Sequence, residues 1–399
     1  MKVLQLCNKP PFPATDGGCI AMKNISLGLL NNSVDLKVIS VSTLKHPFSL
    51  DNFPKEFVKQ TNIESVFVDT TVKAYDALSS LFSKDCYNVS RFFSSELEQK
   101  IKQNLETNTY DFIILESLFL SPYINIIQKY SSAKIILRSH NFEYLIWLRL
   151  AQKEKNILKK GYLKYLSTSL QKYETQILQN VHGVVTISNE DTKKYLQVNP
   201  NLNITTVPFG IDFENYTPKF ESFDGKLSLF HIGSMDWNPN IEAMDWFLKH
   251  VWRKINSKPL ELHLAGKNMP QSLLNLKNKQ IINHGQVESA TDFIASHDIM
   301  IVPLFSGGGM RIKIIEAMAM GKTVISTTIG LEGIHATHQK NVIIANTESE
   351  FIFEINQLLK NPNKLNEIGK NARQFVEKEH NNDELVKSFI SFANSLQND

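Results

Sequence analysis

The segment 303–333 combines glycines, cations and a carboxylate at a spacing that suits a negatively charged ligand. An apolar run at 298–304 leads into a loop with three consecutive glycines, Gly307, Gly308 and Gly309. Without a Cβ atom, such residues let backbone N–H groups approach a ligand closely. Met310 then begins a predicted helix, whose N-terminus favours an anion. We therefore expect this loop to bind phosphate.

Charged side chains on the same helix support this interpretation. Arg311 and Lys313 lie in its first turn, where cations oppose the helix dipole unless something negative compensates them. A diphosphate is the natural compensating group. The alternative is a tight loop between packed elements, with both cations in solvent. The presence of Arg311, Lys313 and Glu316 on one short helix favours the phosphate site.

A motif at the end of this helix looks like a second phosphate site but is not one. Gly321, Lys322 and Thr323 resemble the last residues of a P-loop, yet the first glycine of that motif would fall at Glu316. We instead expect Gly321 to end the helix in a left-handed conformation. A strand at 323–327 follows, so the segment forms a βαβ unit with a right-handed crossover.

Short apolar runs alternate with helical patterns along the whole chain, which is typical of an α/β doubly wound architecture. The predicted strands are 2–6, 36–40, 65–68, 111–115, 134–138 and 183–187 in the first half, and 227–232, 261–265, 281–284, 298–302, 323–327 and 341–345 in the second. We expect two Rossmann-like domains facing one another, over 1–207 and 208–380. The remaining segment, 381–399, is predicted to form a helix that packs back across the junction.

Ligands of doubly wound sheets lie beyond the carboxyl ends of the strands. The residues predicted there are Gly17, Gly18 and His140 in the first domain and Gly233, Ser234, Gly266 and Val287 in the second. His140 directly follows a strand, so we assign it to the site. Glu116 also ends a strand, but we favour a structural role for it. We give the same structural role to three histidines in or beside strands, His182, His231 and His263.

Composition excludes several classes of protein. The 399 residues are 42% hydrophobic and 10% aromatic, which is ordinary for a globular chain of two or three domains. Cys7, Cys19 and Cys86 have neither disulfide nor zinc spacing, so we expect a reducing, cytoplasmic compartment. The first apolar run is too short for a signal peptide and predicts a strand. No apolar stretch has the length of a membrane-spanning helix.

Positive charge is concentrated in the first half of the chain. Residues 1–210 hold 24 Lys and Arg against 18 Asp and Glu, whereas residues 211–399 hold 19 against 22. The lysine-rich segment 153–178 has apolar residues at helical spacing, which predicts an amphipathic helix. We favour a solvated face on a helix packed against its own domain, and the alternative is contact with an anionic membrane. Nucleic-acid binding is not expected, because the sequence has no reader motif.

Together these features resemble the GT-B glycosyltransferases, specifically the retaining group 4 (group 1-type) enzymes that use nucleotide-activated sugars. The resemblance covers nearly the whole chain. It rests on Gly17, Gly18, His140, VVTIS (184–188), VPFGID (207–212), GSMDWNPN (233–240), GQV (285–287) and GGGMRIKIIEAMAMGKTVIST (307–327). The resemblance implies a GT-B fold and transfer of a sugar from a nucleotide-diphosphate sugar, with no separate cofactor and no metal.

The resemblance also implies roles for the matching positions. Glu316 would accept hydrogen bonds from the nucleotide ribose. The pyrophosphate would be held by N–H groups around Gly309, with Arg311 and Lys313 neutralising its charge. The donor site would include Gly17, Gly18, Gly233, Ser234, Gly266, Val287, Gly307, Gly308, Gly309 and Met310, with the nucleobase beside Gly266 and Val287. His140 would contact the transferred sugar, which gives a catalytic set of His140, Arg311, Lys313 and Glu316.

Two positions depart from the family pattern. Gly308 stands where the family often has a sugar-binding glutamate, so the donor sugar stays open. Asp236 and Asn238 occupy the loop that often supplies an arginine and a lysine, and we expect Arg311 and Lys313 to replace that pair.

The expected acceptor is a glycan or a polyprenyl-linked glycan of cell-surface polysaccharide or glycoconjugate biosynthesis. The reaction would then take place in the cytoplasm at the inner face of the membrane. Two alternatives remain open: a nucleotide-sugar epimerase on the same fold, and a catalytically silent partner of another glycosyltransferase, which Gly308 motivates.

Overall fold

A computed structural model describes residues 1–14, 16–71, 86–218, 220, 227–255 and 260–397. The chain forms two compact units. The first contains Met1–Gly210 together with Asn382–Asp399, and the second contains Ile211–Asn381. The sequence-based boundaries fall after residues 207 and 380.

A parallel sheet forms the centre of the first unit. Its strands are β1 (Lys2–Cys7), β2 (Asp35–Ser42), β3 (Glu64–Phe67), β4 (Phe112–Glu116), β5 (Lys134–Ser139), β6 (Gly183–Thr186) and β7 (Ile204–Thr206). Their spatial order is β3-β2-β1-β4-β5-β6-β7, so the order reverses between β1 and β4. In β4, Ile113 packs into the core on one side of the sheet and Ile114 into the core on the other. Both faces of this strand are therefore buried, as parallel sheets require.

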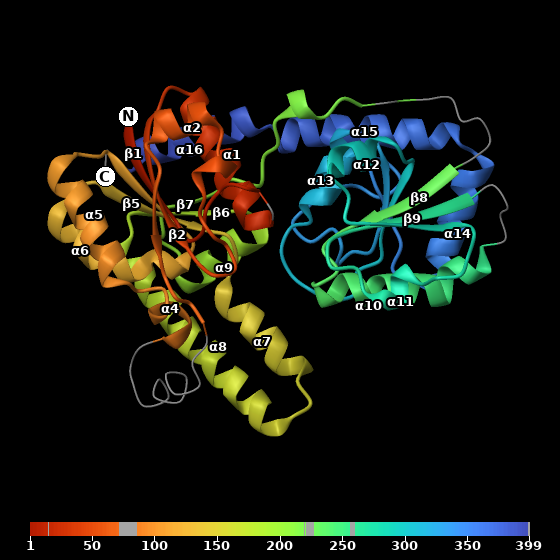
Figure 1. Ribbon diagram of the computed structural model, residues 1–399, viewed down its shortest axis with the longest axis horizontal. Helices are drawn as coiled ribbons and strands as arrows, with labels where there is room; N and C mark the ends of the chain where they lie inside the picture. The colour runs from red at the N-terminus through yellow and green to blue at the C-terminus, as the bar shows by residue number, and fades with distance from the viewer. Residues whose placement is uncertain (15, 72–85, 219, 221–226, 256–259, 398–399) are drawn as a thin grey trace. The chain divides into compact units, whose positions relative to one another are not determined.

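Helices flank this sheet, as Figure 1 shows. They are α1 (Gly17–Asn31), α2 (Lys55–Thr61), α4 (Tyr87–Ser90), α5 (Ser95–Thr107), α6 (Ile124–Tyr130), α7 (Glu143–Lys153), α8 (Ile157–Ile177), α9 (Asn189–Val198) and α16 (Asn382–Ser395). The last of these comes from the C-terminus, and its Val386 and Phe389 join the core of the first unit. A side chain at Gly28 of α1 would collide with Val386, so the two helices approach closely there.

The second unit repeats the same plan on a smaller sheet. Its strands are β8 (Leu227–Ile232), β9 (Leu260–Ala265), β10 (Ile281–Gly285), β11 (Ile299–Val302), β12 (Thr323–Ser326) and β13 (Ile343–Ile344). The order is β10-β9-β8-β11-β12-β13, with the reversal between β8 and β11. Its helices are α10 (Asn238–Trp246), α11 (Gln271–Leu274), α12 (Ala290–Ala295), α13 (Ile312–Ala319), α14 (Glu348–Lys360) and α15 (Asn363–Glu379).

The structure confirms the predicted fold class: two doubly wound α/β sheets and a C-terminal helix that returns to the first unit. Strand β7 was missed, because its three residues are only partly buried and carry no apolar run. The βαβ unit around α13 ends as expected. Gly321 has φ +70°, and the N–H groups of Gly321 and Lys322 donate to Met318 and Ala317 in a left-handed cap.

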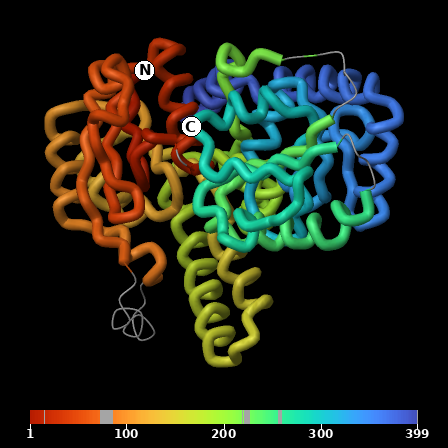
Figure 2. The backbone as a smooth tube through the Cα atoms, turned by 45° about the vertical axis from the view of Figure 1, so that its right-hand side comes forward, coloured from red at the N-terminus to blue at the C-terminus, as the bar shows by residue number. Residues whose placement is uncertain are grey.

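The basic segment 153–178 contains the predicted helix, which spans Ile157–Ile177 as α8 and follows α7 after a short turn. The two helices pack along each other as a hairpin that extends away from the sheet of the first unit (Figures 1 and 2). Leu166 and Leu170 are buried near its base, whereas Ile157 and Leu158 at its tip are 83% and 85% exposed. Nowhere in the described part of the chain is a helix both long and apolar enough to cross a membrane.

Candidate functional site

The predicted residues of the second unit gather at the carboxyl edge of its sheet. Backbone hydrogen bonds link the loops that follow β8, β9 and β10. The N–H group of Met235 donates to Lys267 at 2.8 Å, and that of Gly266 donates to Gly285 at 2.7 Å. A Cβ atom at Gly266 would collide with the Gly233 carbonyl group, so only glycine permits this approach. Gly233 and Gly266 therefore meet, with exposed Ser234 and the segment that leads to Val287 beside them.

The glycine loop follows β11, the other strand at the reversal point of this sheet. Gly307 and Gly309 have φ values of +97° and +85°, which side-chain-bearing residues rarely adopt. A Cβ atom at Gly307 would collide with the ring of Trp237, while Gly308 is exposed. The loop is thus packed against the loop after β8, and its backbone bends twice before it reaches Met310.

Arg311 caps the start of α13 through its backbone. Its side chain is 9% exposed, and its guanidinium lies 5.1 Å from the centre of the Trp237 ring. The Arg311 side chain makes no capping hydrogen bond to this helix, and the N-terminal N–H groups of α13 point out of the same end as the glycine loop. A buried cation and a helix N-terminus together favour an anionic ligand.

Glu316 lies one turn into α13 and is 7% exposed. Lys313 pairs with its carboxylate, with 2.6 Å between Nζ and Oε2, and the Tyr216 hydroxyl donates to Oε1 at 3.0 Å. Burial, and then the neighbouring Glu316 carboxylate, raise the pKa of Tyr216. Lys313 was expected at the pyrophosphate, but here its ammonium engages Glu316, three residues further along the helix. The carboxylate retains lone pairs for a further donor.

The segment Gly321–Thr323, which resembles the end of a P-loop, has a structural role, as predicted. The ammonium of Lys322 donates to the Ala295 carbonyl at 2.9 Å, and the hydroxyl of Thr323 donates to the Leu365 carbonyl at 3.0 Å. Both side chains are buried in the unit and face its own backbone.

In the first unit, His140 follows β5 and meets a buried charged network. Its Nε2 atom lies 2.6 Å from Oε2 of Glu116, at the end of β4, and Arg138 donates to the same oxygen at 2.9 Å. Gln5 of β1 donates to the second carboxylate oxygen at 2.8 Å. Strand register builds the network, because Glu116 is paired with both Cys7 and Arg138 across the sheet.

The electrostatics of this network fix the protonation of both main groups. Burial alone would raise the pKa of Glu116, but Arg138, followed by His140, outweighs it and lowers that pKa to about 2. Burial lowers the pKa of His140, although the hydrogen bond to Glu116 works in the opposite direction. At neutral pH a carboxylate therefore accepts the proton on Nε2 of a neutral imidazole. The lone pair of the ring is then on Nδ1.

Gly17 and Gly18 form the first turn of α1, which Asp16 caps by accepting from the Cys19 N–H group at 2.9 Å. Lys9 binds both oxygens of Asp16 at 2.7 Å. A Cβ atom at Gly18 would lie 2.8 Å from Nζ of Lys9. Lys9 also contributes to the lowered pKa of His140. The structure thus brings Gly18 and His140 into one charged region at the carboxyl ends of β1, β4 and β5.

One group of potential metal ligands lies in this region: Asp16, Cys19 and His46, whose ligand atoms are within 4.8 Å of one another. The group suits a metal poorly. The ammonium of Lys9 already occupies both oxygens of Asp16, and burial raises the pKa of Cys19 to about 11. A thiol must lose its proton to bind a metal.

Three contributors to the sites were missed at the sequence level. Tyr216 and Trp237 lie in loops, and each meets its partner only because the chain returns to the same edge of the sheet. Glu116 was assigned to structure, although its position after a buried strand is the signal that also identified His140. Its pairing with Arg138 needs the strand register, which the sequence does not display.

A protein-family model matches most of the second unit. The model described as "Glycosyl transferases group 1" matches residues 226–361, which include the glycine loop and α13. The chain is also similar to an uncharacterised 44.6 kDa protein in the cps region of Klebsiella pneumoniae, with 24% identity over 98% of this chain and 99% of the relative.

Solved structures show the same fold. Sucrose-phosphate synthase from Thermosynechococcus elongatus aligns with a TM-score of 0.72 and 14% identity, covering 99% of each chain. HepE from Anabaena, in complex with UDP-glucose, aligns with a TM-score of 0.64 and 14% identity over the whole of both chains. At these identities the likeness establishes the GT-B architecture.

Proposed function

We propose that this chain, which has the GT-B fold, is a glycosyl transferase of the group 1 family that moves a sugar from a nucleotide-diphosphate sugar to a glycan or polyprenyl-linked acceptor. The observation that carries the proposal is the arrangement around α13. Three features lie at the carboxyl edge of the second sheet: the glycine loop with two positive φ values, the buried Arg311 guanidinium and the Glu316 carboxylate. Phosphate oxygens suit the first two, and ribose hydroxyls suit the third.

UDP is the first nucleotide to test. HepE, which shares the fold, has been solved with UDP-glucose, and the Klebsiella relative lies in a cps region, which fits an acceptor in polysaccharide biosynthesis. The loops after β9 and β10 are joined at Gly266 and Gly285, and the loop after β8 contacts both the loop after β9 and the glycine loop, which suits a flat base near a diphosphate. Gly308 leaves the identity of the sugar open.

Breaking a sugar–phosphate bond builds negative charge on the leaving diphosphate. Arg311 and the N–H groups of α13 are held in place before the reaction, so they stabilise the transition state more than the ground state. In this scheme the protein supplies the positive charge, and no metal is required. We infer retention of the anomeric configuration, with His140 against the transferred sugar. Glu116 fixes the ring orientation of His140 and leaves its Nδ1 as an acceptor.

The α7–α8 hairpin suits peripheral contact with the anionic lipids at the inner face of the cytoplasmic membrane. Its tip exposes Ile157 and Leu158, and exposed lysines surround them: Lys153, Lys155, Lys159 and Lys160. Apolar side chains that enter the headgroup region, together with lysines that meet acidic lipids, form a typical interfacial anchor. A membrane-bound acceptor would then lie close to the first unit.

The experiment is a thermal unfolding series with UDP, GDP, ADP, CMP and dTDP. A ligand that binds only the folded protein at about 100 times its Kd stabilises it by about 2.7 kcal/mol. We expect one nucleotide to raise the Tm selectively in the wild type and not in Arg311→Ala. The exposed control Lys360→Ala should respond like the wild type. Absence of a shift with every nucleotide would favour the catalytically silent alternative, and conversion of the donor sugar without an acceptor would favour the epimerase.

A further inference from the structure

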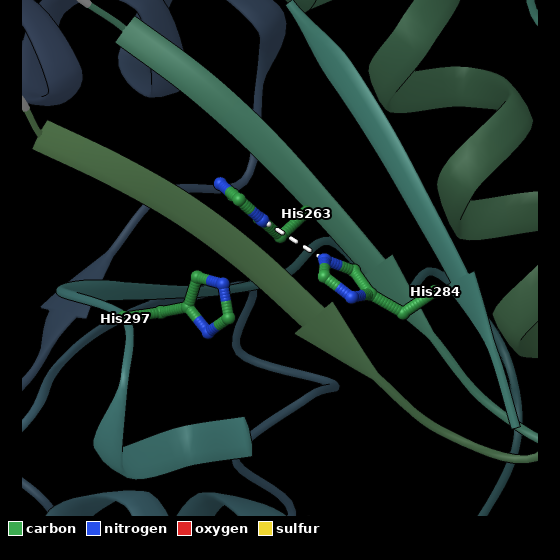
Figure 3. Close-up of side chains that lie close together, drawn as sticks. All are labelled: His263, His284 and His297. Atoms are coloured by element: carbon green, nitrogen blue, oxygen red, sulfur yellow. Dashed lines mark hydrogen bonds between the residues drawn. The ribbon is translucent and has the colours of Figure 1, made fainter. Parts of the chain in front are cut away.

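Three histidines of the second unit meet at a place that the proposed transfer reaction does not use. His263 comes from β9, His284 from the end of β10, and His297 from the turn between α12 and β11 (Figure 3). Each offers a ring nitrogen, and these nitrogens all lie within 4.8 Å of one another. Segments far apart in the sequence thus place three potential metal ligands together.

A β-bulge positions the exposed member of the cluster. Asn283 pairs with Leu264 and Gly285 pairs with the next residue, Ala265, so His284 is an extra residue with no partner on β9. Bulges turn a side chain away from the regular alternation of a strand. Here the bulge brings Nε2 of His284 to 3.0 Å from Nδ1 of His263, which the dashed line in Figure 3 marks.

The hydrogen bonds leave nitrogen lone pairs for a cation. Only one proton can lie between the facing nitrogens of His263 and His284, and a metal ion could replace it. His297 donates from Nδ1 to the Phe293 carbonyl at 2.6 Å, which leaves the lone pair on its Nε2. On the far side of His263, Nε2 lies 3.5 Å from the Glu261 carboxylate. A carboxylate behind a ligating imidazole is the usual outer support of such a site.

The electrostatics also suit a metal better than a proton. Burial, and then the neighbouring His297 and His284, lower the pKa of His263 to about 4, and burial lowers the pKa of the other two rings. The imidazoles are therefore neutral at pH 7, which is the form that binds metals. Phe230 and Phe293 pack around them, so an aromatic cluster without a metal is the competing interpretation.

We propose that His263, His284 and His297 bind one divalent ion of the zinc class, with the solvent side of His284 open to a water ligand. Three imidazoles and a water form a common zinc set, with Zn–N distances of about 2.0–2.1 Å. Nitrogens on a tetrahedral ion at those distances lie about 3.3 Å from one another, and the nitrogens of His263 and His284 are 3.0 Å apart here. The ion would fasten edge strand β10 to the turn before β11, and its role would be to stabilise the second unit. The site does not depend on the proposed transfer reaction.

The test uses the full chain without a histidine tag, stripped of metal with a chelator and titrated with Zn²⁺ by calorimetry. We expect one ion per chain. His284→Gln should weaken binding by more than about 100-fold, because loss of even an outer-shell partner costs about 10–100-fold. The exposed His335→Gln, in the same unit, is the matched control and should bind like the wild type.

Co²⁺ provides a second readout at the same site. Bound to the wild type in place of Zn²⁺, it should give the strong visible absorption of a four-coordinate ion, and His297→Gln should remove that absorption. Since His284 is on the surface, its variant tests the site even if the buried His297→Gln does not fold. Absence of Zn²⁺ binding in the wild type, or equal binding in the wild type and His284→Gln, would overturn the proposal and leave the aromatic cluster.

Discussion

Oε2 of Glu116 lies 2.6 Å from Nε2 of His140 and 2.9 Å from Nη1 of Arg138, so one buried carboxylate oxygen holds both the candidate sugar-binding histidine and a cation. Strand β4 supplies Glu116, the neighbouring strand β5 supplies Arg138, and His140 directly follows β5. The carboxylate orients the ring, and Arg138 keeps the carboxylate ionised. The network therefore fixes the orientation of the His140 ring, whereas burial lowers the pKa of His140 against the opposing effect of Glu116.

Glu116 makes the first unit sensitive to acid. Its pKa is about 2 in the folded chain against an ordinary 4.5, so its contribution to stability is present above pH 4.5 and is lost as the pH falls towards 2. The shift corresponds to about 3 kcal/mol. In calorimetry, Glu116→Gln should lower the Tm of the first unit at pH 7, since Arg138 is then buried without its partner, and should flatten the acid dependence. A variant as acid-sensitive as the wild type would contradict this assignment.

A pair of buried carboxylates in the same unit should have the opposite effect on the pH dependence of stability. Burial, and then Glu174, raise the pKa of Glu143 to about 8, and burial raises that of Glu174 to about 7. Glu143 begins α7, and Glu174 of α8 accepts from the N–H groups of Glu143 and Tyr144. Because the folded state holds protons that the unfolded state releases, stability should fall as the pH rises from about 5 to 8.

Glu143→Gln removes one of these carboxylates at nearly constant shape. The variant should melt at a higher temperature than the wild type at pH 8 and at nearly the same temperature at pH 5. The comparison with Glu116→Gln, whose effect is largest near neutral pH and vanishes in acid, provides the internal control. Equal Tm values for Glu143→Gln and the wild type at pH 8 would show that the carboxyl is not protonated in the folded chain.

The glycine loop offers a matched pair of substitutions. Gly307 has φ +97° and would place a Cβ atom against the Trp237 ring, so Gly307→Ala should displace the loop and weaken donor binding by at least about 10-fold. Gly308 is exposed, so Gly308→Ala should change binding little. Nucleotide titration of the two variants makes the comparison. Equal losses would contradict the packing of Trp237 against the loop.

The hairpin tip can be tested with vesicles that contain phosphatidylserine. Replacement of Ile157 and Leu158 by serine, or of Lys159, Lys160 and Lys164 by glutamate, should each reduce co-sedimentation, because the first set supplies apolar area and the second supplies charge. Only the lysine variant should alter the salt dependence. The control is a variant of the second unit in which three exposed cations are replaced by glutamate: Lys249, Arg253 and Lys254. Unchanged binding of both hairpin variants would exclude the hairpin as the membrane contact.

The sequence predicted the parts of this protein that depend on local pattern. Twelve predicted strands correspond to observed ones, because buried parallel strands are continuous apolar runs, and Gly321 ends its helix as expected. The half-buried β7 has no such run. Contacts that depend on strand register, or that join residues far apart in the sequence, could not be predicted from local sequence patterns. The pairing of Glu116 with His140 is one, the contact of Tyr216 with Glu316, a hundred residues away, is another, and the bulge that turns His284 is a third.

The central claim, that Glu316 binds the ribose of a donor nucleotide, is tested most directly by titrating UDP and 2′-deoxy-UDP into the wild type and Glu316→Gln. A hydrogen bond to a charged group is worth about 1.5–3 kcal/mol, so the wild type should prefer UDP by at least about 10-fold. The preference should disappear in Glu316→Gln, and it should persist in Tyr216→Phe and in the exposed control Glu367→Gln. An undiminished preference for UDP in Glu316→Gln would contradict the account.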